Sequence, residues 1–248
     1  MIVNVMSADI VVDYKKLKKG EERPRPLDLI LFKGGDLVSD AIRFLEGRCL
    51  RHTSRIKLEE GVRSFSHVGL VVTREILDDE RLERDKLYVW ESTMSGPLSD
   101  GVKNVNGESF LGVQIRDLDK VVNAYLSDED AKIAFASLKD PVNCEALRHR
   151  FTRFVRKHDG TRYDANFASL FGSIFPALRP LRNLTEKVFR TQKWLFCSEL
   201  AALTYKKMGI FPSDCDPRDC VPMDFLGFDE DRLPIVVKEP IYIKTSLK

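Results

Sequence analysis

The sequence lacks several features that would assign it to a membrane or secreted class. No hydrophobic run approaches the ~20 apolar residues that span a bilayer. The start, residues 1–6, does not have the basic-then-apolar order of a secretory signal peptide. The five cysteines are an odd number at irregular spacing, which excludes the usual disulfide framework of a small secreted domain. We therefore expect a cytoplasmic, reducing compartment.

Strong charge of one sign is also missing. The 40 basic and 38 acidic side chains leave a net charge of +2, which argues neither for nor against nucleic acid. A basic face is predicted on a helix at 143–158, but no aromatic residues interleave with its charges, so we expect no nucleic-acid partner. Cys215 and Cys220 form a C-x4-C pair, and two ligands at this spacing do not predict zinc. No metal or cofactor is expected.

One cysteine stands at the start of a predicted helix. After Cys197, leucine and methionine recur at helical spacing as far as Met208, and Gly209 stands where a left-handed C-cap would end the helix. The first turn of a helix exposes backbone N–H groups and the positive end of the dipole, which favour thiolate over thiol. Cys197 is therefore the candidate nucleophile. The alternative is a buried structural cysteine.

Two ionisable side chains lie within apolar predicted strands. His67 belongs to the predicted strand 66–73 and Glu91 to the predicted strand 86–93. A symmetric antiparallel pairing centred on Asp79 places them opposite each other, whereas a one-residue slip would place them on opposite faces. A buried carboxylate needs a partner, so we predict that the two satisfy each other. A purely structural His–Glu hydrogen bond at a sheet edge is the alternative.

The other elements are weaker predictions. A charged stretch with two prolines indicates a flexible N-terminal segment over residues 1–25, followed by one domain over residues 26–248. The pattern predicts strands at 27–32 and 110–116, helices at 36–47, 131–138 and 143–158, and edge-strand runs within 233–244. Residues 165–181 carry an apolar stripe that predicts either a core helix or an apolar wall over a substrate channel, with possible membrane-surface or lipid contact.

Several motifs resemble one family. They are Pro26-Leu-Asp-Leu-Ile-Leu-Phe32, Ser66-His-Val-Gly69, Val89-Trp-Glu-Ser92, Tyr163-Asp164 and Phe196-Cys-Ser-Glu-Leu200. Together they resemble the circularly permuted NlpC-type papain-like hydrolases, which include bacterial YiiX-like proteins, poxviral relatives and, more distantly, lecithin:retinol acyltransferases. The order His, Glu, Cys is the permuted one. This chain departs from the family at Leu27, where glycine is frequent, in insertions at 48–64 and 165–192, and in a C-terminal extension.

The resemblance implies an α+β, permuted papain-like fold, with a small antiparallel sheet packed against helices and the nucleophile at a helix N-terminus. It implies that Cys197 attacks a carbonyl, that His67 carries the proton and that Glu91 orients the imidazole. Tyr163 and Ser198 are candidate substrate or oxyanion residues.

The function expected from these features is a cysteine-dependent hydrolase that acts on an amide or ester bond of a peptide or acyl-lipid substrate. The apolar stripe at 165–181 favours a substrate with a large apolar part. Two alternatives stay open. One is an acyltransferase, and the other is a catalytically silent binding or structural protein, for example a virus-particle component.

Overall fold

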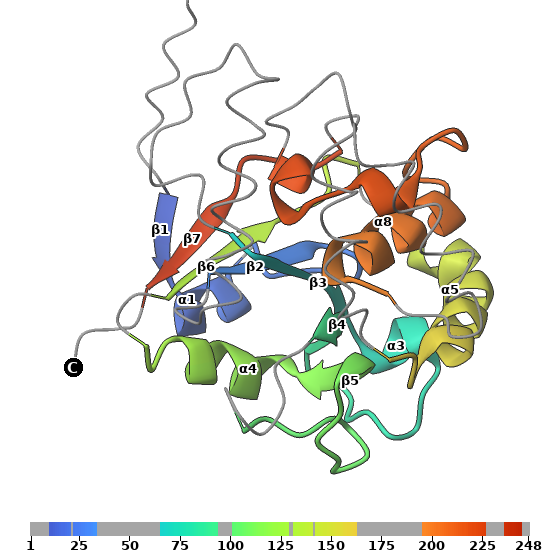
Figure 1. Ribbon diagram of the computed structural model, residues 1–248. Helices are drawn as coiled ribbons and strands as arrows, with labels where there is room; N and C mark the ends of the chain where they lie inside the picture. Colours follow the sequence, from blue (N-terminus) through green and yellow to red (C-terminus); the bar gives the residue numbers. More distant parts are fainter. Residues whose placement is uncertain are drawn as a thin grey trace, which may run out of the picture.

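The computed structural model describes residues 10–20, 22–33, 65–93, 101–128, 131–140, 142–162, 195–226 and 236–244. These residues form an α+β fold around one seven-stranded sheet, in the order β1-β7-β6-β2-β3-β4-β5 (Figure 1). The helix predicted at 36–47, the insertion at 48–64 and the apolar segment at 165–181 lie outside the described residues. Within the described ranges, no helix is both long and apolar enough to cross a bilayer.

The strands are β1 (Ile10–Asp13), β2 (Leu29–Lys33), β3 (His67–Val72), β4 (Tyr88–Thr93), β5 (Gly112–Asp117), β6 (Lys132–Ala136) and β7 (Ile241–Lys244). The helices are α1 (Tyr14–Lys19), α3 (Arg74–Leu77), α4 (Leu118–Tyr125), α5 (Cys144–His158) and α8 (Cys197–Met208), and the short 3-10 helices are η2 (Pro217–Asp219) and η3 (Pro222–Leu226). The pair β1–β7 is parallel and the other pairs are antiparallel. The sheet is thus larger than the small antiparallel sheet expected.

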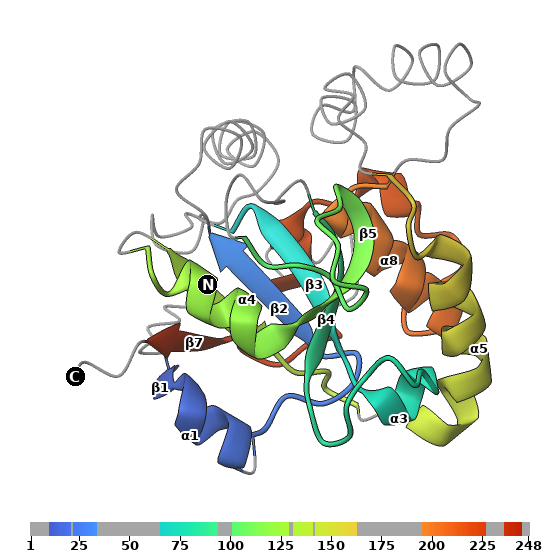
Figure 2. The same cartoon turned by 90° about the horizontal axis from the view of Figure 1, so that it is seen from below.

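Helices cover both faces of this sheet. Figures 1 and 2 show α3, α5 and α8 on one side and α1 and α4 on the other. Because strand side chains alternate between faces, β2, β3, β4 and β6 each contribute to two separate apolar cores. In β3, Val68 and Leu70 pack in the core beneath α8, while Val71 packs in the core beneath α4. The same alternation assigns His67 and Gly69 to the α4 face.

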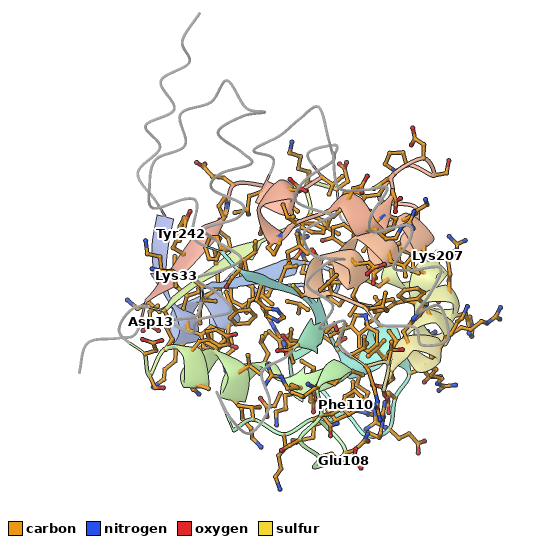
Figure 3. The ribbon with its side chains drawn as sticks, in the orientation of Figure 1. Asp13, Lys33, Glu108, Phe110, Lys207 and Tyr242 are labelled. Atoms are coloured by element: carbon orange, nitrogen blue, oxygen red, sulfur yellow. The ribbon has the colours of Figure 1, made fainter. Side chains whose placement is uncertain are left out.

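The helix that carries Cys197 is confirmed. α8 begins at Cys197 and is followed by Gly209, which has a left-handed φ of 78°. The Gly209 N–H donates to the carbonyls of Lys206 and Tyr205 in the last turn of the helix. In Figure 3, Lys207 of its last turn lies on the side of the molecule away from Asp13 and Lys33. The predicted helix at 143–158 is also confirmed as α5, and Asn143 caps it by accepting from the Ala146 N–H at 3.1 Å.

The helix predicted at 131–138 is wrong, because residues 132–136 form β6 between β7 and β2. Ile133 and Phe135 enter the core beneath α4, and Ala134 and Ala136 enter the core beneath α8. A short apolar run that is buried on both faces carries no periodicity that separates strand from helix. The helix of this region lies earlier, as α4, with Asp117 as its N-cap.

The two ends of the described chain also differ from expectation. Residues 10–19, expected to be flexible, form β1 and α1. Tyr14 and Leu17 are buried, and Asp13 accepts from the first-turn N–H groups of α1. The C-terminal strand is not at the sheet edge, because β1 pairs with its outer side. An apolar N-terminal strand thus covers β7 and buries surface that an edge strand would expose.

The turn before β2 holds a buried carboxylate in a network of neutral donors. Asp28 accepts hydrogen bonds from the Arg25 N–H at 2.8 Å, the Leu138 N–H at 2.9 Å and the Ser137 hydroxyl at 3.0 Å. These bonds tie the start of β2 to the chain that follows β6. The preceding Leu27 has a φ of 71°, a left-handed conformation that favours glycine.

Candidate active site

The candidate residues meet at one end of the sheet. His67 is the first residue of β3, and at the same end Thr93, the last residue of β4, pairs with Gly112, the first of β5. The start of α8 is fastened there, because the Ser92 hydroxyl donates to the Leu195 carbonyl at 2.6 Å, two residues before the helix begins. Strand ends and a helix N-terminus therefore bring together residues that are distant in sequence.

β3 and β4 are adjacent and antiparallel, as predicted, but the predicted register is wrong by two residues. Leu70 pairs with Trp90, so Gly69 rather than His67 stands opposite Glu91. A two-residue shift keeps both side chains on the same face, because side chains alternate with period two. His67 consequently reaches Glu91 along a diagonal, and Nε2 of the ring lies 2.6 Å from Glu91 Oε2.

Gly69 makes this diagonal contact possible. A Cβ atom at Gly69 would lie 2.5 Å from Val89 Cγ2 and 3.2 Å from Glu91 Cβ. The glycine of the His-Val-Gly motif is therefore required for the close approach of β3 to β4.

A third strand contributes a residue of the candidate site that the sequence did not reveal. Arg116 on β5 donates from Nε to Glu91 Oε1 at 2.6 Å, and both side chains are fully buried. Each oxygen of Glu91 thus has a cationic or ionisable partner on a neighbouring strand. In sequence, Gln114 and Arg116 alternate with Val113 and Ile115, a pattern that normally indicates a solvent-facing side of the strand.

The electrostatics of this cluster follow from its partners. Burial alone raises the pKa of Glu91, but the Arg116 charge and the His67 contact outweigh burial and lower that pKa to about 2. Burial lowers the pKa of His67, whereas its contacts with Cys197 and Glu91 raise it, and the net effect is a pKa raised to about 10. The geometry therefore favours a carboxylate at Glu91 and an imidazolium at His67.

Cys197 completes the cluster from the other layer. It is the first residue of α8 and 5% exposed, and it interacts with the His67 ring, an interaction that raises the pKa of that ring. Because Nε2 of that ring contacts Glu91, Nδ1 is the nitrogen that remains for the thiol. The N-cap residue Phe196 supplies no side-chain acceptor to the first turn of α8, so no cap side chain competes for its N–H groups.

Aromatic packing against Phe32 also positions the His67 ring. The ring stacks on Phe32 of β2 with a centroid distance of 5.6 Å, and Phe32 in turn contacts Tyr125 at the end of α4. Only 12% of the His67 side chain is exposed. The ring is therefore held by Phe32, Glu91 and Cys197, which belong to three different elements.

The two remaining candidates are placed differently. Ser198 is the second residue of α8 and is buried next to Cys197 in the chain. Tyr163 lies outside the described residues. In the part of the chain that the structure describes, no three His, Cys, Asp or Glu side chains are grouped as metal ligands.

Neither a scan against models of known protein families nor a search of curated proteins finds a match for this chain.

Proposed function

We propose that this protein is a cysteine-dependent hydrolase of an amide or ester bond, built on a permuted NlpC-type papain-like fold. The observation that carries the proposal is the position of the His67 ring between the Cys197 thiol and the Glu91 carboxylate. A nucleophile that contacts a base, which is in turn oriented by a third group, is the arrangement that activates a thiol for acyl transfer.

The reaction would proceed through a thioester. Cys197 Sγ, as thiolate, attacks the substrate carbonyl carbon, and the developing oxyanion is stabilised by backbone N–H groups in the first turn of α8. The His67 imidazolium gives its proton to the departing amine or alcohol as the carbon–heteroatom bond breaks. His67 then takes a proton from water, and the resulting hydroxide releases the acid and frees the thiolate. The Ser198 hydroxyl, beside the nucleophile, is a candidate substrate contact.

The location of the three groups also supports the fold part of the proposal. The chain order His67, Glu91, Cys197 is that of the permuted family, and it requires the nucleophile helix to return to the strands that carry the other two residues. α8 does so, packing against β3 and β4. A structural His–Glu pair alone would explain neither a helix N-terminus nor a cysteine beside the ring.

Two other functions use the same residues. An acyltransferase would pass the acyl group to an alcohol or amine in place of water, and the chemistry up to the thioester would be identical. A silent binding or structural protein would retain the cluster without turnover. The intact set of Cys197, His67 and Glu91 favours catalysis over the silent alternative.

Acyl probes that trap a nucleophilic cysteine test the proposal and address its substrate. One probe carries a peptide and the other a long fatty-acyl chain, and each is offered to the wild-type protein, Cys197→Ala and the matched control Cys220→Ala, which removes another buried core cysteine. We expect labelling of the wild type and of the control, but none of Cys197→Ala. Failure of both probes to label a folded wild-type protein would favour the silent alternative, and the preferred probe would indicate a peptide or acyl-lipid substrate.

A further inference from the structure

Glu91 is placed between two groups that compete for its charge. On one side Oε2 lies 2.6 Å from His67 Nε2, and on the other Oε1 lies 2.6 Å from Arg116 Nε. The three residues lie on adjacent strands β3, β4 and β5 and share the α4 face of the sheet. Neither Glu91 nor Arg116 has any exposed side-chain surface. This is therefore a fully desolvated carboxylate that bridges an imidazole and a guanidinium.

A buried imidazole and a buried carboxyl in such short contact can share one proton in two ways. The proton can stay on the ring, which gives an ion pair, or move to the carboxyl, which gives two neutral groups. Removal from water favours the neutral arrangement, because charged groups are costly to desolvate. A fixed positive charge beside the carboxylate reverses this preference, because it stabilises the anion and cannot itself lose its proton.

The groups around His67 favour the ion pair over the neutral arrangement. Cys197 approaches the ring from α8 and Glu91 from β4, while β2 contributes the uncharged ring of Phe32. Behind Glu91, the charge of Arg116 is the strongest of the influences that oppose burial and hold the carboxyl in its ionised form. Arg116 Nε donates to the carboxylate at 2.6 Å, and this charge-assisted bond stabilises the anion at Glu91.

We propose that Arg116 is a positioning residue that keeps the shared proton on His67 rather than on Glu91. The inference rests on the proposed function, in which His67 must hold a proton for the leaving group. If the proton moved to Glu91, the ring would be neutral and could donate only after recovering the proton from a buried acid. Arg116 therefore keeps His67 protonated and ready to act as the general acid.

The location of the proton can be measured without any substrate. Nitrogen-15 NMR of histidine-labelled protein distinguishes an imidazolium from a neutral ring, and infrared difference spectra against Glu91→Gln reveal a carboxylic-acid C=O band from Glu91. Near neutral pH we expect an imidazolium and no such band in the wild type and in Arg116→Lys, which keeps the charge. In Arg116→Met we expect a neutral His67 ring and a carboxylic-acid band that disappears in the Arg116→Met, Glu91→Gln double variant.

Reaction rates give a second measurement. We expect probe labelling of Cys197 to slow about a hundredfold in Arg116→Met, the lower end of what general acid–base catalysis contributes, and to recover substantially in Arg116→Lys. Asp28→Asn is the matched control, because Asp28 is as buried as Glu91 but lies outside the cluster. It should leave the labelling rate and the His67 spectrum unchanged.

A folded Arg116→Met protein that retains the His67 imidazolium and shows no acid band would overturn the proposal, as would a folded Arg116→Lys protein with a neutral ring. If the methionine variant does not fold, the wild-type infrared spectrum still decides. A Glu91 acid band at neutral pH contradicts the proposal, and its absence together with an imidazolium in Arg116→Lys supports it. These spectra do not depend on turnover, so a silent Cys197 would be recognised separately by failed labelling.

Discussion

Glu91 in β4 and Asp28 in the turn before β2 are equally buried carboxylates, each 1% exposed, but their surroundings differ in kind. Glu91 contacts an imidazole and a guanidinium. Among the described residues, Asp28 accepts hydrogen bonds from two backbone N–H groups and a hydroxyl. The pKa of Glu91 is lowered to about 2, mainly by the charge of Arg116 acting against burial, whereas burial raises the pKa of Asp28 above its ordinary value.

This difference distinguishes a structural carboxylate from the candidate catalytic one. Hydrogen bonds from neutral donors satisfy the Asp28 carboxylate and tie β2 to the segment after β6. These bonds do not require the carboxyl of Asp28 to be fully ionised. The surroundings of Glu91 instead hold a negative charge in place, next to the ring that contacts the candidate nucleophile. A fold that needed only a cross-strand tie at Glu91 would not require an arginine buried behind it.

The largest contrast should appear when each carboxylate is deleted. Glu91→Ala leaves Arg116 buried without its counter-ion, so we expect a loss of about 3–5 kcal/mol in the free energy of unfolding. Asp28→Ala leaves only neutral donors unsatisfied, which costs about 1–3 kcal/mol. Urea denaturation of both variants beside the wild type measures the difference. Equal losses would mean that the charge network around Glu91 has no special energetic role.

The pH dependence of stability should differ in sign between the two sites. Because the folded-state pKa of Glu91 is about 2 against 4.5 for the ordinary group, its stabilising contribution is complete above 4.5 and is lost as pH falls through 2. The folded-state pKa of Asp28 is raised above 3.8, so protonation favours the fold and its contribution improves as pH falls toward 3.8. Urea titrations at several pH values, comparing the wild type with Glu91→Gln and Asp28→Asn, should give opposite slopes.

A smaller effect is expected from Gly69→Ala. The new Cβ atom would overlap Val89 and press on Glu91, and overpacking of this kind costs about 1–3 kcal/mol. It should also slow probe labelling, because Glu91 would move relative to His67. Gly20→Ala is the matched control, since Gly20 has an ordinary φ of −83° and its nearest obstacle is 3.3 Å away, outside the cluster. Similar stability and labelling in both variants would contradict the role assigned to Gly69.

The sequence alone predicted those parts of the site that depend on local patterns. The helix from Cys197 to Met208 follows from its apolar spacing and the C-cap Gly209, and the adjacency of β3 and β4 follows from two strand-like runs joined by one charged connector. The register of β3 against β4 could not be predicted in this way. It depends on the connection between the strands, which contains the α3 turn and ends that turn with a left-handed Asp78. The contact between His67 and Glu91 survived the error because a two-residue shift preserves the face.

The role of Arg116 and the strand β6 were not predicted, and the reason is the same for both. A polar residue at alternate positions of a strand looks the same whether that face meets water or a buried carboxylate, and Arg116 meets the latter. Ile133 and Phe135 likewise look helical or extended until their neighbours are known. In both cases the deciding information is which element covers the second face of the sheet, and that is a tertiary property.

The central claim is that His67 activates Cys197, and alkylation rates measure it most directly. Cys197 is 5% exposed whereas Cys144 is only partly buried, so accessibility alone predicts that Cys144 reacts faster with iodoacetamide. Burial also raises the pKa of Cys144. Near neutral pH we predict faster alkylation of Cys197, and loss of most of that advantage in His67→Ala. Alkylation of Cys197 at the same rate in the wild type and in His67→Ala would contradict the claim.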